Sequence, residues 1–516
     1  MAKGDKVLGR GLQKILIANR GEIAVRILRS VRQMGINVAV VYSDTDRFAA
    51  HVRLADEAYR LKGESSRETY LNQEAILRIA VQARVDAIHP GYGFLAENAS
   101  FAEAVRSHGI VFIGPSTEII RSMGSKTEAR RLMAKAGLPL VPGSNGSLKV
   151  GTGAVGIAER IGYPVLVKAS GGGGGKGMRI VKLPEELLDS MQRAASEAQS
   201  SFGDNRIYLE KYIEHPRHIE LQILADEHGT VVCLGERECS IQRRHQKVIE
   251  ETPSAFLTES MRQRMVESAV RAARDLGFTN AITMEFLVDR KRNFYFLEAN
   301  TRLQVEHPVT EMVTGIDMIK EQVRIAQGEP LRFTQDEIIR RGHAIEARVY
   351  AEDPFEEFRP SSGRILRYRQ PAGPGIRVDG GIAEGCEVSV FYDPLIAKVI
   401  AWGSDREEAC LRLIGALGEF EIVGVRHNIP LLLAILGHPG FASGAIDTHF
   451  IQDHIRPDRL GAEKLLDETE LEAAAVAAAG VYDAAMSRSV VGGGDPTGNT
   501  RQQRDKWIRR RLDTTT

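Results

Sequence analysis

The sequence predicts a protein of mixed α/β and α+β architecture that is divided into several domains. Near the start, the apolar run Lys14–Ala18, a glycine at Gly21, a helical pattern up to Met34 and the run Val38–Tyr42 give the order strand, helix, strand. Further along, two pairs of strand-like runs are each joined by a short turn and predict hairpins. With 516 residues the chain is long enough for about three such units.

Composition favours an enzyme that acts on small molecules. The 68 basic and 68 acidic residues balance, so nothing indicates a nucleic-acid or membrane partner. The four cysteines, Cys233, Cys239, Cys386 and Cys410, lack a CxxC spacing, which argues against structural zinc and against secretion. No apolar signal core or bilayer-length apolar stretch is present, and the expected location is therefore cytoplasmic.

The segment Ser125-Lys-Thr-Glu128 has the spacing of a capping box, with apolar residues following at helical intervals. Lys126 would then stand at the start of a helix, where the backbone already favours anions. The earlier motif His89–Asn98 carries two glycines and either lines a site or merely turns the chain.

The first predicted hairpin has a glycine-rich tip. Its strands are Tyr163–Ser170 and Met178–Lys182, and its tip contains Gly171, Gly172, Gly173, Gly174 and Gly175. Five successive glycines cost backbone entropy, which backbone N–H groups folding over phosphate oxygens would justify; a flexible linker is the alternative. The tip is not a Walker loop, because that pattern needs glycine in place of Ser170 and Ser or Thr in place of Gly177. Lys168, in the apolar strand, would be a poor core residue without an anionic partner.

The second predicted hairpin leads into a row of polar residues at every second position. Glu298, Asn300, Arg302, Gln304 and Glu306 would share one face of an extended strand. If the hairpin is symmetric about its turn, Glu285 lies opposite Glu298, and like charges in that position are destabilising. A divalent cation would resolve the conflict, because two carboxylates and the Asn300 amide oxygen are ligands that Mg²⁺ accepts. The alternative is a solvated polar face on an edge strand.

The motif Gln242-Arg-Arg-His-Gln-Lys247 packs four cationic or ionisable groups into six residues. Such a run is commonly a solvated loop, but beside a nucleotide site it would gather anions.

Together these motifs resemble the ATP-grasp superfamily and, more narrowly, biotin carboxylases. The resemblance covers about Leu12 to Asp453 and rests on Ala18–Ala24, His89–Phe94, Lys168–Met178, Gln242–Lys247 and Glu298–Pro308. It implies an ATP-grasp fold with an N-terminal Rossmann-like domain over 1–125, a small lid domain with the glycine-rich loop over 126–212 and a C-terminal mixed domain over 213–455. Residues 456–516 are an extension that either docks to partners or is partly disordered.

The resemblance also implies a role for each matching residue. ATP would be held by the glycines 171–175 and by Lys126, Lys168, Glu210, Lys211, His218, Gln242 and His245. Mg²⁺ or Mn²⁺ would be held by Glu285, Glu298 and Asn300. Bicarbonate would meet Lys247, Arg302, Gln304 and the backbone at Val305, with Glu306 as its base. Arg348 would steady the ureido oxygen of biotin.

The resemblance further implies partners. The sequence contains no Met-Lys pair of the kind that accepts biotin, so biotin would come from a separate biotin carboxyl carrier protein, with carboxyltransferase subunits completing the assembly. A homodimer is also implied. Arg348 and the Gln242–Lys247 motif disfavour another ATP-grasp ligase. Three functions remain open: a biotin carboxylase subunit of an acyl-CoA carboxylase, the same subunit of a pyruvate carboxylase, or a non-catalytic ATP-binding scaffold. The last would be expected to lack one of Glu285, Glu298, Arg302 and Glu306, and all four are present.

Overall fold

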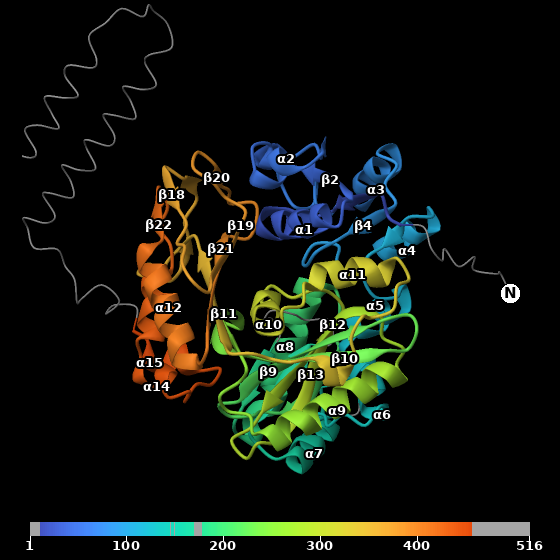
Figure 1. The fold of residues 1–516 in the computed structure, drawn as a ribbon. Coiled ribbons are helices and arrows are strands. Elements are labelled where there is room, and N and C mark those ends of the chain that lie inside the picture. The colour runs from blue at the N-terminus through green and yellow to red at the C-terminus, as the bar shows by residue number, and fades with distance from the viewer. Residues whose placement is uncertain (1–10, 145, 149, 170–177, 457–516) are drawn as a thin grey trace, which may run out of the picture. The chain divides into compact units, whose positions relative to one another are not determined.

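The computed structural model describes residues 11–144, 146–148, 150–169 and 178–456, all within one compact unit. Three main β-sheets organise it (Figure 1). The predicted glycine tip, 171–175, and the predicted extension after residue 456 lie outside the described residues. None of the helices among the described residues has the length and apolar character needed to cross a membrane.

The first sheet has five parallel strands in the order β3-β2-β1-β4-β5. The strands are β1 (Lys14–Ile17), β2 (Asn37–Tyr42), β3 (Glu57–Arg60), β4 (Ala87–His89) and β5 (Val111–Phe112). Their helices are α1 (Gly21–Gln33), α2 (Ala50–Leu54), α3 (Gln73–Gln82), α4 (Ala99–Ser107) and α5 (Thr117–Gly124). Because strand order reverses between β1 and β4, the crevice at their carboxyl ends is a natural ligand position.

The second sheet is small and antiparallel, in the order β7-β6-β8. It comprises β6 (Val165–Ala169), β7 (Met178–Val181) and β8 (Ile207–Lys211), with α7 (Thr152–Ile161) and α8 (Leu187–Phe202). Side chains such as Val165, Val167, Met191 and Leu209 form a core of its own. The strands that flank the glycine tip therefore pair as the sequence predicts.

The third sheet has eight strands in the order β13-β12-β9-β10-β11-β14-β21-β19, and every pair is antiparallel. Its strands are β9 (Arg217–Ala225), β10 (Val231–Arg243), β11 (Gln246–Thr252), β12 (Asn280–Val288), β13 (Phe294–Asn300), β14 (His343–Tyr350), β19 (Ile376–Gly380) and β21 (Leu395–Gly403). The short strands β15 (Glu352–Asp353), β16 (Arg359–Pro360), β17 (Gly363–Arg364), β18 (Arg367–Arg369), β20 (Glu387–Val388) and β22 (Glu421–Val423) form small two-stranded pairs beside it.

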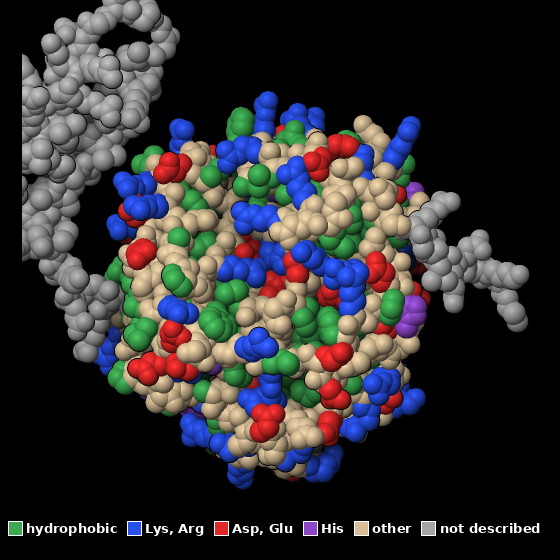
Figure 2. All heavy atoms as spheres, viewed as in Figure 1, with side chains coloured by type: hydrophobic (Ala, Val, Ile, Leu, Met, Phe, Trp, Pro, Cys, Tyr) green, Lys and Arg blue, Asp and Glu red, His purple; other side chains and the backbone are tan. Residues whose placement is uncertain are grey.

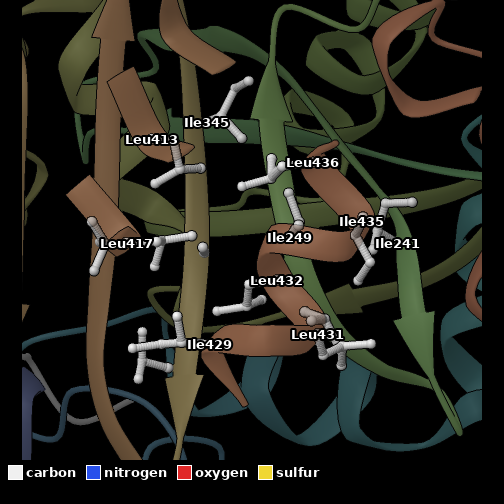
Figure 3. Packing of buried hydrophobic residues seen from close by; sticks show 14 of the residues in the cluster. Ile241, Ile249, Ile345, Leu413, Leu417, Ile429, Leu431, Leu432, Ile435 and Leu436 are labelled. Atoms are coloured by element: carbon white, nitrogen blue, oxygen red, sulfur yellow. The ribbon is translucent and has the colours of Figure 1, made fainter. Parts of the chain in front are cut away.

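Helices bury the apolar faces of this sheet. They are α6 (Lys126–Lys135), α9 (Glu259–Asp275), α10 (His307–Thr314), α11 (Met318–Ala326), α12 (Arg406–Glu419), α13 (Ile429–Leu436), α14 (Pro439–Ala442) and α15 (Phe450–His454). In Figure 3, Leu413 and Leu417 of α12 and Leu432 of α13 meet Ile249 and Ile345 of the sheet. All of these side chains are buried, so close packing against α12 and α13 holds this end of the sheet in place.

The second predicted hairpin is confirmed, and Glu285 of β12 pairs with Glu298 of β13. The pairing is not symmetric about the turn, because the register shifts between Glu285 and Phe286, which pairs with Phe296. The prediction that all five polar residues share one strand face is wrong. β13 ends at Asn300, and the backbone N–H of Thr301 donates to Glu97 Oε1 at 3.0 Å instead of continuing the ladder. Arg302, Gln304 and Glu306 therefore lie on the loop before α10.

Helix α6 begins at Lys126, as predicted, but the capping box is wrong. Ser125 makes no capping hydrogen bond from its side chain. Glu128 instead accepts two hydrogen bonds from Arg131, at 2.9 and 2.6 Å.

The buried His89 gives folding a pH dependence that can be measured. Its side chain is inaccessible to solvent, and burial lowers its pKa from 6.5 to about 3. Below pH 6.5 the unfolded chain takes up a proton that the folded chain refuses, so this contribution to stability falls with decreasing pH down to about pH 3. His89→Gln should remove about 1.4 kcal/mol per pH unit from the slope of unfolding free energy between pH 6 and 4. Urea titrations at several pH values measure it.

The control is the exposed His108, where His108→Gln should leave the slope unchanged. An unchanged slope in His89→Gln would contradict the buried neutral histidine.

Candidate functional site

A cavity of about 1060 Å³ lies where the three sheets meet. Its lining includes loop residues after β1 and β4, strands β6 and β8 of the small sheet, and the large sheet from β13 to β14. On the face shown in Figure 2, basic and acidic side chains gather in a hollow near the centre of the molecule. The cavity is therefore strongly charged, with apolar walls.

The first sheet contributes its crevice between β1 and β4. Asn19, just after β1, donates from Nδ2 to the carbonyl oxygens of Pro90 and Tyr92, both at 2.7 Å. Gly91 adopts a φ of +66°, and a Cβ there would lie 2.9 Å from Asn19 Nδ2. Glycine is thus required at this close approach. The motif His89–Asn98 lines the cavity through Tyr92, Gly93 and Phe94, which settles the alternative between site and turn.

Lys247 is the central cation of the site. Its Nζ lies 2.5 Å from Glu220, 2.6 Å from Glu306 and 3.2 Å from Glu285. Burial alone would lower the pKa of Lys247, but the three carboxylates raise it well above its usual range. The ammonium is therefore permanently charged and holds together strands β9 and β12 and the loop before α10.

Glu306 is fully buried between two cations. Its Oε1 accepts from Lys247, and its Oε2 accepts from Arg348 Nη2 at 2.9 Å. Burial acts to raise the pKa of Glu306, yet Lys247, Arg348 and Arg237 lower it well below its usual range. Arg348 also pairs with Glu250 at 2.5 Å. Glu306 is therefore an ionised, oriented carboxylate beside the cavity.

Glu285 and Glu298 face each other, but protein cations already offset part of their charge. Glu285 contacts Lys247, and its Oε2 lies 2.8 Å from His218 Nε2. Glu298 has a longer contact, 3.9 Å, with Lys126 Nζ. Partial burial and the facing Glu285 raise the pKa of Glu298. Glu298 is thus the carboxylate with charge left to neutralise.

Asn300 lies between the carboxylates and the arginine of the loop. Its Nδ2 donates to Glu285 at 2.7 Å, and its Oδ1 accepts from Arg302 Nη2 at 3.2 Å. Gln304 also donates to Glu285, at 3.1 Å. The structure therefore brings together all the predicted metal and bicarbonate residues, including Val305, whose carbonyl accepts from Lys398 at 2.8 Å.

The predicted ATP residues that the structure describes, all except the glycines 171–175, also line the cavity. Lys168 has the anionic partner that its position demands, since its Nζ lies 2.6 Å from Glu210, which also pairs with Arg130. Lys211 donates to the carbonyls of Gly162 and Tyr163 at 3.0 and 2.9 Å. Gln242 Nε2 lies 2.8 Å from His218 Nδ1. Burial and then the nearby Lys168 lower the pKa of His245, which favours a neutral ring.

Family comparisons match most of the described chain. "Biotin carboxylase, N-terminal domain" matches residues 11–120, "Carbamoyl-phosphate synthase L chain, ATP binding domain" matches 125–334, and "Biotin carboxylase C-terminal domain" matches 346–453. The chain belongs to the biotin carboxylase family. The predicted family, the ATP-grasp fold and an ATP-dependent ligase are thereby confirmed.

Relatives and solved structures agree. A biotin carboxylase of Nostoc sp. is 52% identical over 85% of this chain and 98% of its own length. The mitochondrial propionyl-CoA carboxylase alpha chain of Homo sapiens is 51% identical over 86% of this chain, which spans 61% of that protein. The biotin carboxylase domain dimer of Hydrogenobacter thermophilus 2-oxoglutarate carboxylase, solved with MgADP, ADP and bicarbonate, is 48% identical, with a TM-score of 0.84 over 88% of this chain and 99% of that one.

Two site residues escaped the sequence-based prediction. Glu97, the second-last residue of the His89–Asn98 motif, accepts a hydrogen bond from Arg302 Nε at 2.7 Å. Glu220 lies under Lys247 and pairs with the fully buried Arg237. A signal for Glu220 was present, because His218, Glu220 and Gln222 alternate along β9 as the residues of the later row do.

Removing the Lys247 charge should destabilise this biotin carboxylase fold. Lys247→Met leaves three buried carboxylates without their shared cation, and a loss of about 3–5 kcal/mol in unfolding free energy is expected. Urea unfolding followed by tryptophan fluorescence and circular dichroism measures it.

The matched control is Lys211→Met, whose ammonium serves only carbonyl oxygens among the described residues. It should cost about 1 kcal/mol. Equal losses in the two variants would contradict the central role of Lys247.

Proposed function

We propose that this protein carboxylates biotin with ATP and bicarbonate, through carboxyphosphate, on a separate carrier protein. The observation that carries the proposal is the oriented, ionised Glu306, held by Lys247 and Arg348, both of which line the cavity together with Arg302. Bicarbonate is a poor nucleophile that must lose a proton, so it needs a carboxylate within reach and cations around its oxygens. These residues supply both.

The ATP phosphates would lie between Lys126 and Lys168, under the glycines 171–175 and near Glu210, Lys211, His218, Gln242 and His245. Lys168 supports this assignment, because its ammonium borders the cavity while its only carboxylate partner among the described residues, Glu210, is shared with Arg130. A nucleotide phosphate would meet cationic charge that Glu210 does not fully offset.

Mg²⁺, or Mn²⁺ in its place, fits the residues present. Glu298 faces Glu285 across the hairpin and keeps a side chain that is 42% exposed, with only a long contact to Lys126. Glu285, Glu298 and Asn300 are oxygen donors, as a hard cation requires. Bound there, the ion would offset the two carboxylates and spread the charge of the phosphate oxygens.

Glu306 would remove the bicarbonate proton. In the structure Lys247 and Arg348 hold the pKa of Glu306 low against the opposing effect of burial, which keeps the group free to accept a proton. An anion bound by Lys247, Arg302 and Gln304 would share the charge of Lys247 and raise the pKa of Glu306, strengthening the base. Arg348 would then stabilise the negative charge that develops on the ureido oxygen of biotin.

The divisions 1–125, 126–212, 213–455 and 456–516 are part of the same proposal, except that α6 (Lys126–Lys135) packs in the core of the large sheet, so the moving part of the lid would begin after this helix. The separate core of the small sheet supports a lid that closes over the nucleotide and excludes water, to which carboxyphosphate is labile. Biotin carboxyl carrier protein and carboxyltransferase subunits are the proposed partners, in a homodimer, with the extension as docking segment. The proposed location is cytoplasmic, from cysteine usage.

The relatives' names differ in acceptor, propionyl-CoA in one case and 2-oxoglutarate in the other. We propose the first half-reaction of an acyl-CoA carboxylase. A pyruvate carboxylase subunit stays the alternative, because the carboxyltransferase, and not the carboxylation of biotin, selects the final acceptor. Copurification of partner subunits distinguishes these.

Arg302→Ala should lower bicarbonate-dependent ADP formation by about 10²–10³-fold while leaving ATP binding largely intact, since its guanidinium donates to Gln304 of the proposed bicarbonate pocket and is hydrogen-bonded to none of the described residues proposed to hold ATP. Coupled ADP assays and nucleotide titration calorimetry measure the two quantities. The control is the exposed Arg332→Ala, which should match the wild type. Loss of ATP binding in Arg302→Ala would overturn the assignment.

Glu306→Gln should keep the shape of the site and remove its base. We expect biotin carboxylation by ¹⁴C-bicarbonate to fall about 10²–10⁴-fold, the usual contribution of general base catalysis. Assays with and without free biotin test the reaction itself, because another ATP-grasp ligase would show no biotin dependence. A near-native rate in Glu306→Gln would disprove the proposed base.

A further inference from the structure

A second group of metal-binding side chains lies at the rim of the cavity, away from Glu285 and Glu298. His215, Asp447 and His449 place one ligand atom each within 4.8 Å of one another. His215 Nδ1 lies 3.1 Å from Asp447 Oδ2 and 3.8 Å from Asp453 Oδ2. The His215 and His449 rings are 4.8 Å apart between centroids.

The spacing suits a four-coordinate ion. Bonds of about 2.0–2.1 Å in a tetrahedron place ligand atoms about 3.3 Å apart, close to the observed separation of His215 and Asp447. His449 and Asp453 would have to rotate to reach this spacing, and the side chains of His215, Asp447 and Asp453 are 25–40% exposed, which leaves room around the group for such rotation.

The charges of the group are unbalanced without an ion. Among the described residues, neither Asp447 nor Asp453 forms an ion pair with a lysine or arginine. Two imidazoles and two carboxylates form a mixed nitrogen and oxygen set, which suits zinc and its neighbours and differs from the oxygen-rich set preferred by Mg²⁺.

The position links two distant parts of the chain. His215 lies on the connection 212–216 between β8 of the small sheet and β9 of the large one, and Asp447 and His449 lie just before α15. The Thr448 N–H already donates to the Pro216 carbonyl at 3.0 Å, and Tyr212 Oη lies 3.1 Å from His449 Nε2. An ion here would fasten the connection to the C-terminal segment.

We propose that His215, Asp447 and His449, with Asp453 as fourth ligand, bind a transition-metal ion such as Zn²⁺. The bound ion would restrict movement of the connection 212–216 between the small and the large sheet. The site is separate from the Mg²⁺ site and does not depend on the proposed reaction.

Titration with Zn²⁺ alone, in the presence of excess Mg²⁺ to occupy the oxygen ligands of the cavity, tests the proposal by calorimetry. About one equivalent should bind to the wild-type protein, with affinity falling at least about ten-fold in His215→Ala and in Asp447→Asn. Co²⁺ in place of Zn²⁺ should give the visible absorption of a four-coordinate ion, and this band should be lost in both variants.

The matched control is His108→Ala, which removes an exposed histidine elsewhere and should bind like the wild type. Circular dichroism verifies that each variant is folded. Equal Zn²⁺ binding by wild type, His215→Ala and Asp447→Asn, or a Co²⁺ spectrum of six-coordinate form only, would overturn the site. Failure of biotin carboxylation would leave these results unaffected.

Discussion

The buried ammonium of Lys247 is the interaction on which the site depends. Glu220, Glu285 and Glu306 come from β9, β12 and the loop before α10, and without a shared cation their charges could not be buried together. The same ammonium fixes the position of Glu306 beside Arg348. The Lys247 ion pairs therefore serve both the fold and the proposed reaction, because the residues that would bind bicarbonate also hold the loop before α10 against the large sheet.

This network makes the site responsive to the substrates it would accept. Protein cations offset Glu285, whereas Glu298 retains charge that its distant Lys126 does not cancel. In the proposed function, a divalent ion would supply positive charge at that point, and the nucleotide phosphates and bicarbonate would supply negative charge at Lys168 and Arg302. The positive charge of the metal would favour binding of the anions, and the negative charge of the anions would favour binding of the metal. Each should therefore raise the affinity of the site for the other.

Local sequence patterns predicted the elements but not the long-range contacts. The turn and its two flanking apolar runs predicted the β12–β13 hairpin, but the pairing of Glu285 with Glu298 also depends on an irregularity between Glu285 and Phe286 that shifts the register set nearer the turn. Alternation then extended the strand too far, since the end of β13 depends on Glu97, about 200 residues away in the chain. No local pattern reports such a partner, nor the pairing of Glu220 with Arg237. The family resemblance supplied the residues of the site, and the structure supplied the charges that surround them.

The proposed lid would move with the small sheet, and the contacts of the described residues indicate where such movement would pivot. Lys168 and Glu210 pair with each other on β6 and β8, so they would travel together with their own core. Arg130, on α6, holds Glu210 from the side of the large sheet, whose core contains the neighbouring Ala129 and Met133. Closure of the lid would therefore have to keep the Arg130–Glu210 ion pair or replace it. Phosphate oxygens that bind Lys168 would compete with Glu210 for this ammonium and leave Glu210 paired with Arg130 alone. The residues 212–216 that leave β8 must absorb the remaining rotation, which is why a restraint at that connection would act on the lid as a whole.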